Sequence, residues 1–207
     1  MAKGSYFAKH IAQQENGESV SKRIQLPKIL ISEEAKFFFE QGQVLLIDKP
    51  LHWTSFDVVR KIRSTLKIKK VGHAGTLDPL ATGLLIVCTG KFTKKINEYM
   101  AQVKEYTGTF TLGATTPTYD KESTPENYKA YAHITEQEIK VATQKFLGEI
   151  SQYPPIYSAI KKEGVALYEL ARRGEEVELK VRTVKINELE ITGVKLPVVS
   201  FRVICGT

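Results

Sequence analysis

Cysteine is scarce in this chain of 207 residues, which contains only Cys88 and Cys205. The two lie far apart, each within an apolar run, which indicates buried thiols in a reducing compartment and excludes a fold stapled by disulfides. Histidine is also sparse, and the four positions are His10, His52, His73 and His133. Because they are so scattered, we expect them to form no metal site.

Long apolar runs are lacking as well. None approaches the roughly 20 residues that a membrane-spanning helix needs. The first ten residues, M-A-K-G-S-Y-F-A-K-H, contain no apolar core of the kind found in a secretory signal. These absences predict a cytoplasmic protein without a membrane partner.

The composition is that of an ordinary globular protein, with 42% hydrophobic and 26% charged residues. Lysine and arginine number 30 against 23 aspartates and glutamates, so the formal net charge is +7. An excess of this size favours a polyanionic partner such as a nucleic acid, although many basic proteins bind none.

The sequence contains no complete cofactor-binding motif. Gly90-Lys91 resembles the end of a phosphate-binding loop, but the glycine that should open the loop is missing and Phe92 occupies the place of Ser or Thr. No G-x-G-x-x-G follows a strand, and no G-x-S-x-G is present. We therefore expect chemistry that uses no cofactor.

Hydrophobic periodicity predicts helices and strands interleaved along the chain, and T-E-Q-E at 135–138 predicts a capping box that opens a helix. The expected helices cover 32–40, 55–66, a short stretch ending at 100, 135–147 and 167–173; the expected strands cover 44–47, 84–89, 106–112 and parts of 176–205. Several strands alternate in polarity, which favours an α+β fold with a mixed, largely antiparallel central sheet and flanking helices. We expect residues 1–42 to form an arm and a short helix ahead of a main domain over 43–207.

The helix expected from Ser55, its predicted N-cap, has a basic polar face. The basic residues are Arg60, Lys61, Arg63 and Lys67, followed by Lys69 and Lys70. Such a run is commonly a solvated helix face. Here it directly precedes the stretch described next, so contact with phosphate is an equal alternative.

One stretch stands out, G-H-A-G-T-L-D-P-L-A-T-G from Gly72 to Gly83. Its single carboxylate, Asp78, lies among small, apolar and hydroxylic residues. Taken alone, Asp78 before Pro79 favours a simple turn, since Asp-Pro commonly starts one. The whole stretch, together with three others, indicates a site.

Four segments carry a resemblance in the same order along the chain. They are D-K-P at 48–50 with W-T-S-F at 53–56, the stretch 71–85, K-E-Y at 104–106, and Q-Y-P-P-I-Y-S-A-I-K-K at 152–162 with Tyr168 just after. Together they resemble the bacterial tRNA pseudouridine-55 synthases, the TruB-type family, over about residues 43–207. The resemblance implies that 43–207 is the catalytic domain.

The resemblance implies isomerisation of the uridine at position 55, in the T-loop of tRNA, to pseudouridine. The C–N glycosidic bond breaks, the uracil turns while bound, and its C5 bonds to the ribose, with no metal, redox step or ATP. The target base lies in a folded loop and must be flipped out. The implied partner is tRNA, through its T-loop and T-stem, and we expect the protein to be a monomer.

By the same resemblance Asp78 is the essential carboxylate, which attacks the sugar, attacks the base or removes a ribose proton. Tyr106 stacks on the flipped base, and without the resemblance it would be an ordinary strand aromatic. His73 lies beside the flipped bases, Tyr168 lines the uracil pocket, and Thr76 with its small neighbours lets the nucleotide approach. The expected phosphate contacts are Lys161, Lys162, Arg172 and Arg173. The segment at Lys49 and Pro50 is expected to be structural.

The chain departs from the family pattern at two places. His52 stands where a small residue, commonly glycine, is expected. The family also continues past a Gly-Thr like Gly206-Thr207 into an arginine that pairs with the catalytic aspartate, so we expect a form truncated at the C-terminus without the family's small RNA-binding domain. Two alternatives stay open: an RNA-binding or RNA-folding protein that does not catalyse, and a synthase that acts on another RNA.

Overall fold

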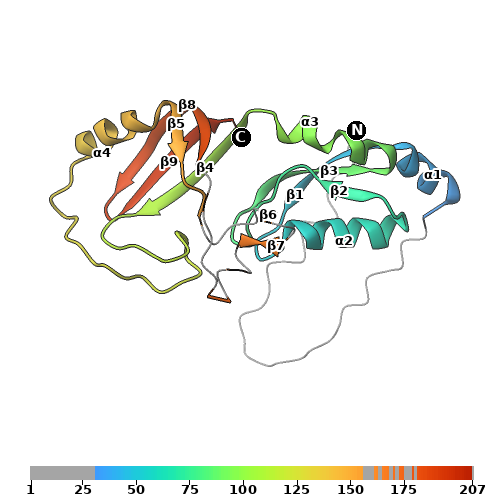
Figure 1. Cartoon of the computed structure of the whole chain (residues 1–207), viewed down its shortest axis with the longest axis horizontal. Helices are drawn as coiled ribbons and strands as arrows, with labels where there is room; N and C mark the ends of the chain where they lie inside the picture. The colour runs from blue at the N-terminus through green and yellow to red at the C-terminus, as the bar shows by residue number, and fades with distance from the viewer. Residues whose placement is uncertain are drawn as a thin grey trace, which may run out of the picture. The chain divides into compact units, whose positions relative to one another are not determined.

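The computed structural model describes residues 31–155, 161–162, 165–167, 170, 173–174, 179 and 181–206. These residues belong to one compact unit, Ile31–Thr207. Their strands form hydrogen-bonded sets of three, four and two, and every pairing between the described strands is antiparallel (Figure 1). The predicted α+β fold is confirmed. Residues 1–30 of the arm predicted at 1–31 lie outside the described residues.

The three-stranded sheet has the order β1-β3-β2. Its strands are β1 (Val44–Lys49), β2 (Val71–His73) and β3 (Gly83–Thr89). The central strand β3 is a nearly continuous apolar run, as expected for a strand with neighbours on both sides. The connection from β2 to β3 carries Asp78, so the sheet fixes both ends of that loop.

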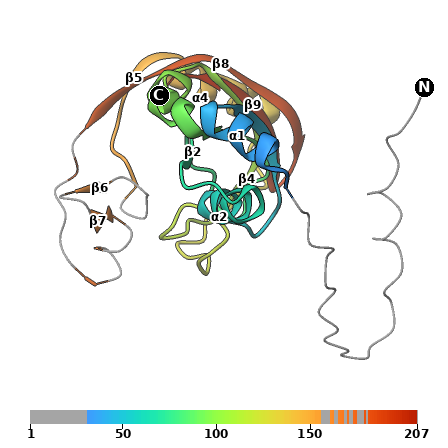
Figure 2. The ribbon, with the colours of Figure 1, turned by 90° about the vertical axis from the view of Figure 1, so that its right-hand side faces the viewer.

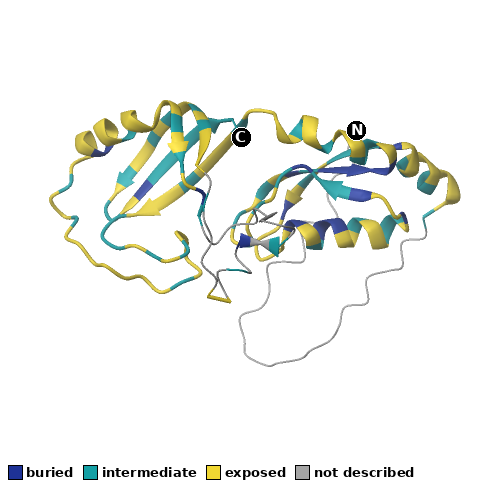
Figure 3. Ribbon diagram, in the orientation of Figure 1, coloured by how far each residue is buried: buried dark blue, intermediate teal, exposed yellow. Residues whose placement is uncertain are grey.

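Helix α2 (Ser55–Leu66) packs against this sheet, next to β2 in both views of the ribbon (Figures 1 and 2). Its apolar face and the strands form one buried cluster, made of Val58, Val59, Ile68, Val71, Leu85 and Val87. Buried positions accordingly gather on α2 and on the strands beside it, whereas the outward helix face is exposed (Figure 3). Apolar burial on this scale is the main stabilising contribution to this part of the fold.

Helix α1 (Glu33–Gln41) is fixed to the same sheet through η1 (Gly90–Lys95), which α3 (Ile96–Met100) follows. The hydroxyl of Thr89, which is fully buried, donates to the Phe39 carbonyl at 2.8 Å and accepts from the Gln43 amide at 3.0 Å. Gly90 has φ +50°, and a Cβ there would lie 2.0 Å from the Glu40 carbonyl oxygen. Only glycine allows this close approach of η1 to α1.

The four-stranded sheet has the order β4-β9-β8-β5. Its strands are β4 (Lys104–Thr111), β5 (Gly148–Gln152), β8 (Arg182–Lys195) and β9 (Val198–Cys205). Helix α4 (Glu136–Thr143) and η2 (Gln144–Phe146) lie against β8. An apolar hollow of about 630 Å³ lies here, with Phe110, Ile139 and Phe201 in its lining. A two-stranded pair, β6 (Lys161–Lys162) and β7 (Val165–Ala166), completes the described strands.

Arg202 links three strands of this sheet. From β9 its guanidinium donates to the carboxylate of Glu105 on β4 at 2.7 Å and to that of Glu188 on β8 at 2.9 Å. The hydrogen bond from Arg202 lowers the pKa of Glu105 below its ordinary value. Because one guanidinium binds carboxylates on both neighbouring strands, it stabilises this register of β4, β9 and β8 over shifted registers.

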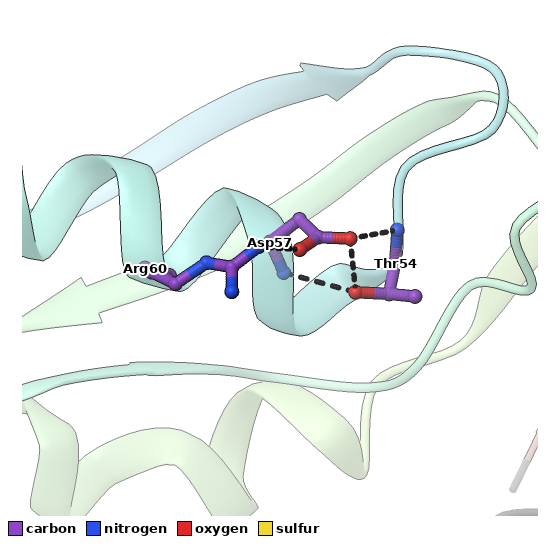
Figure 4. A network of polar contacts seen from close by, with 3 residues as sticks. All are labelled: Thr54, Asp57 and Arg60. Carbon is purple, nitrogen blue, oxygen red and sulfur yellow. Dashed lines mark hydrogen bonds and ion pairs between the residues drawn. The ribbon is translucent and has the colours of Figure 1, made fainter.

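The start of α2 differs from the prediction by one residue. Thr54, and not Ser55, is the N-cap: its hydroxyl accepts from the Asp57 amide at 3.0 Å, and the Asp57 carboxylate accepts from the Thr54 amide at 3.0 Å (Figure 4). The Thr54 hydroxyl also donates to the Asp57 carboxylate at 2.6 Å, and this hydrogen bond, followed by that from the Thr54 amide, lowers the pKa of Asp57. Ser and Thr both cap well, and the carboxylate three residues after Thr54 decides between them. The capping box predicted at Thr135 is confirmed.

Candidate functional site

The Asp78 loop spans residues 74–82, between β2 and β3. Its backbone is closed by two hydrogen bonds, from the Ala74 amide to the Ile86 carbonyl at 2.8 Å and from the Ala81 amide to the Asp78 carbonyl at 3.0 Å. The Asp78 residue itself is exposed. The loop is therefore an ordered turn that presents a carboxylate to solvent.

Two residues of the segment 51–55, His52 and Ser55, hold this loop on both sides of Asp78. The His52 amide donates to the Pro79 carbonyl at 2.8 Å. The Ser55 hydroxyl donates to the Leu77 carbonyl at 3.1 Å and accepts from the Leu77 amide at 2.9 Å. Both sequence neighbours of Asp78 are thus hydrogen-bonded to the same short segment, which leaves the carboxylate little freedom to move with its backbone.

Lys49 stabilises that segment through its ammonium group. Its side chain is fully buried, and its ammonium donates to the Trp53 carbonyl at 2.6 Å and to the Pro50 carbonyl at 3.0 Å. Burial lowers the pKa of Lys49, and the charge of Asp78 partly opposes this shift. A buried ammonium needs such acceptors, and here it uses them to fix the turn that contacts the loop. This agrees with the structural role expected for Lys49.

His52 has φ +65°, in the left-handed region. That conformation is costly for a residue with a Cβ and easy for glycine, which gives a physical reason for the small residue expected at this position. The contact with Pro79 uses only the backbone amide of His52. The side chain is therefore dispensable for holding the loop.

We predict that His52→Gly leaves the reaction rate unchanged and raises the free energy of unfolding by about 0.5–1 kcal/mol, since relief of left-handed strain outweighs the extra entropy of glycine in the unfolded chain. Urea unfolding and a rate assay on the same preparations would measure this. A rate well below that of the unsubstituted protein would show that the imidazole itself takes part.

His73 and Thr76 lie in or next to the loop with Asp78. The His73 Nδ1 is 2.6 Å from the Gly75 carbonyl oxygen. Because a carbonyl can only accept, Nδ1 carries the proton in this contact, and Nε2 is left for another partner. Gly75 has φ +102°, which presents its carbonyl to the ring. Thr76 is exposed. His73 at the end of β2 and Thr76 and Asp78 in the loop thus share one short segment between β2 and β3.

Tyr106 belongs to β4 of the four-stranded sheet, where it is 42% exposed. Partial burial, with a smaller effect of Cys205, raises the pKa of its phenol, so the hydroxyl is protonated at neutral pH. Within the part of the chain that the structure describes, no hydrogen bond joins it to the Asp78 loop. Tyr168, Arg172 and the side chains of Lys161 and Lys162 lie outside the described residues.

Comparison with known proteins decides the family. The model of the TruB family pseudouridylate synthase (N terminal domain) matches residues 63–207. The chain belongs to this family. A tRNA pseudouridine synthase B from Flavobacterium johnsoniae is 57% identical over 173 residues, which cover 80% of this chain and 76% of the relative. That from Phocaeicola vulgatus is 51% identical over 174 residues, 81% of this chain and 74% of the relative.

Solved structures resemble this TruB-family chain as well. The match in the crystal structure of a Cbf5-Nop10-Gar1 complex has a TM-score of 0.59 and 27% identity, and covers 83% of this chain and 41% of that chain. The match in an H/ACA RNP bound to a substrate RNA has a TM-score of 0.56 and 25% identity, over 83% of this chain and 39% of that one. The chain spans less than half of these solved chains. Family membership assigns it to the isomerases that convert uridine to pseudouridine in tRNA.

In this TruB-family site, Ser55 makes a contact that the sequence did not predict. It was expected to cap its helix, and its contact with Leu77, 22 residues away, was not foreseen. A signal does exist in the sequence: Thr54 and Ser55 are adjacent hydroxyls, and only one can be the N-cap. The other is then free for a tertiary hydrogen bond.

The described residues contain neither a candidate metal site nor a helix that could span a membrane. No three His, Cys, Asp or Glu side chains among them gather in a way that could hold a metal ion. No helix in the same residues has both the length and the apolar character needed to cross a bilayer. Both cysteines are free thiols, and Cys88 is buried as expected, whereas the prediction of a buried thiol is wrong for Cys205, which is partly exposed at the end of strand β9.

Proposed function

We propose that the chain converts the uridine at position 55, in the T-loop of tRNA, to pseudouridine, with Asp78 as the essential carboxylate. The observation that supports this most is an exposed carboxylate whose two sequence neighbours are hydrogen-bonded to His52 and Ser55. An enzyme that acts on a nucleotide flipped out of a folded RNA needs an acidic group that is fixed in place and still open to a large substrate.

The reaction is an isomerisation, so atoms balance without a co-reactant. The bond between ribose C1′ and uracil N1 breaks, the base turns, C1′ bonds to C5, and the proton on C5 leaves as N1 gains one. Asp78 acts by attack on the sugar, by attack on the base or by removal of a ribose proton, and each route needs the ionised carboxylate. The small residues around Asp78 leave space for the nucleotide.

The remaining assignments follow the family pattern. Tyr106 stacks on the flipped base, for which its exposed ring and protonated hydroxyl are suited. His73 presents Nε2 to the neighbouring bases, and Thr76 borders the entering nucleotide. Tyr168 lines the uracil pocket, while Lys161 and Lys162 contact phosphates. We propose that residues 43–207 form the catalytic domain, and that the protein works in the cytoplasm as a monomer without a cofactor.

A lysine surface supports the choice of an RNA partner. We give this name to Lys67, Lys69, Lys70, Lys91, Lys94 and Lys95, all of them exposed. The first three lie in the turn before β2 and the others in η1, and the Gly90 amide joins the two segments by donating to the Lys70 carbonyl at 2.8 Å. No described carboxylate forms an ion pair with any of the six. Such uncompensated charge suits the phosphates of the tRNA.

We predict that the triple variant Lys67→Gln, Lys69→Gln, Lys70→Gln weakens tRNA binding and reduces the slope of log affinity against log salt by about one per lysine that contacts a phosphate. Filter binding of tRNA at salt concentrations from about 50 to about 200 mM would measure both the affinity and the slope. The charge-matched control replaces Lys145, Lys185 and Lys195, which are exposed on the other sheet and η2. Equal slopes in both triple variants would contradict a role for the lysine surface.

Release of tritium tests the proposed function directly. Transfer RNA carrying uridine tritiated at C5 is mixed with the full product of the gene, and release equal to one C5 proton per tRNA is expected. A tRNA with cytidine at position 55 should give none. Continued release from that tRNA would indicate another target uridine, whereas tRNA binding without release would favour the RNA-binding alternative.

A further inference from the structure

We propose that Ser55 is a positioning residue for the reaction, whose hydroxyl sets the orientation of the peptide that precedes Asp78. The inference rests on the proposed role of Asp78 as the essential carboxylate. In this role Ser55 touches neither substrate nor reacting atoms, and it determines how the carboxylate is presented.

One hydroxyl, that of Ser55, satisfies both backbone groups of one residue, Leu77. Ser55 is 2% exposed, and its Oγ donates to the Leu77 carbonyl at 3.1 Å while accepting from the Leu77 amide at 2.9 Å. A serine hydroxyl has one donor and two acceptor lone pairs, so this pairing uses its donor and one lone pair. The Leu77 backbone is thereby held in both directions, and its side chain packs against the core cluster under α2.

The helix does not need this hydroxyl for itself. Thr54 supplies the N-cap, and the capping box with Asp57 is complete without Ser55 (Figure 4). Two adjacent hydroxyls therefore have separate tasks: that of Thr54 begins the helix, and that of Ser55 holds the loop. This separation provides a matched pair of variants.

Loss of the Ser55 hydroxyl leaves the Leu77 amide and carbonyl without a partner in a half-buried position. The backbone before Asp78 then shifts toward water, while the bond from His52 still holds Pro79 on the far side. The carboxylate becomes misplaced without being lost. A displacement of about 1 Å can slow a reaction about 100-fold, because a catalytic group must lie close to its near-attack position.

The test compares Ser55→Ala with Thr54→Ala in the full product of the gene. Both variants should lower the thermal midpoint by similar amounts. Only Ser55→Ala should lower kcat, by about 10- to 100-fold, with KM for tRNA within about threefold. Thr54→Ala should keep kcat within about twofold, because its hydrogen bonds are confined to the start of α2. Amide exchange at Leu77 should accelerate in Ser55→Ala alone.

Ser55→Thr keeps a hydroxyl at Cβ and should recover kcat to within about fivefold, since the lost hydrogen bonds can form again. A normal kcat in Ser55→Ala, an equal loss of kcat in Thr54→Ala, or a Ser55→Thr variant as slow as Ser55→Ala would each overturn the proposal. Absence of tritium release from the unsubstituted protein would instead count against the proposed function, so the two failures are distinguishable.

Discussion

Asp78→Asn is expected to abolish pseudouridine formation, with a loss of at least about 1,000-fold in rate, because the amide can neither attack nor take a proton in any of the three routes open to the carboxylate. Binding of tRNA should not weaken, because the substitution removes one charge of the same sign as the phosphates. The affinity should change by no more than about threefold. Asp78 is exposed, and no described side-chain hydrogen bond depends on its carboxylate. The fold should therefore be kept, with a small loss of stability because the buried Lys49 ammonium loses the favourable charge of Asp78.

Tritium release from C5-labelled tRNA measures the rate, and filter binding of the same tRNA measures the affinity. The matched control is Glu149→Gln, the same exchange of carboxylate for amide at an exposed position of β5. It should release tritium at the rate of the unsubstituted protein. Full release by Asp78→Asn would rule out the assignment of Asp78, and would leave membership of the family untouched.

Local pattern was sufficient for much of the fold. The continuous apolar run at 84–89 predicted β3, and the spacing T-E-Q-E at 135–138 predicted the capping box of α4. Both features depend on residues within one or two turns of each other, which is where propensity and periodicity are informative. The Gly72–Gly83 stretch was marked as a site for a different reason, its resemblance to a known family.

Contacts between distant segments could not be predicted from the sequence. The bond between Ser55 and Leu77 and the approach of Gly90 to Lys70 join residues about twenty apart, and each depends on how α2 and η1 pack on the sheet. The sequence shows that His52 stands where a small residue is expected. Its left-handed backbone, however, follows from the turn that the buried Lys49 ammonium fixes through the Trp53 carbonyl. Such constraints come from tertiary packing, which no local pattern contains.

The largest expected effect on stability comes from Leu85→Ala. Leu85 is 2% exposed on the central strand β3 and belongs to the cluster formed with α2. Removal of its side chain leaves a cavity between helix and sheet, so we expect a loss of about 2–5 kcal/mol in the free energy of unfolding. Urea unfolding followed by far-UV circular dichroism would measure it.

Leu84→Ala is the matched control, because Leu84 is the preceding residue on the same strand and 62% exposed on the opposite face. Its loss should change the free energy of unfolding by no more than about 0.5 kcal/mol, as for other surface substitutions. Equal effects of the two variants would contradict the assignment of faces on β3. Since β3 closes the Asp78 loop at Gly83 and pairs with the strand that leads into residues 51–55, a looser core should also slow the reaction. That loss of rate should grow with temperature toward the unfolding midpoint, whereas the loss in Ser55→Ala should persist at temperatures where the protein is fully folded.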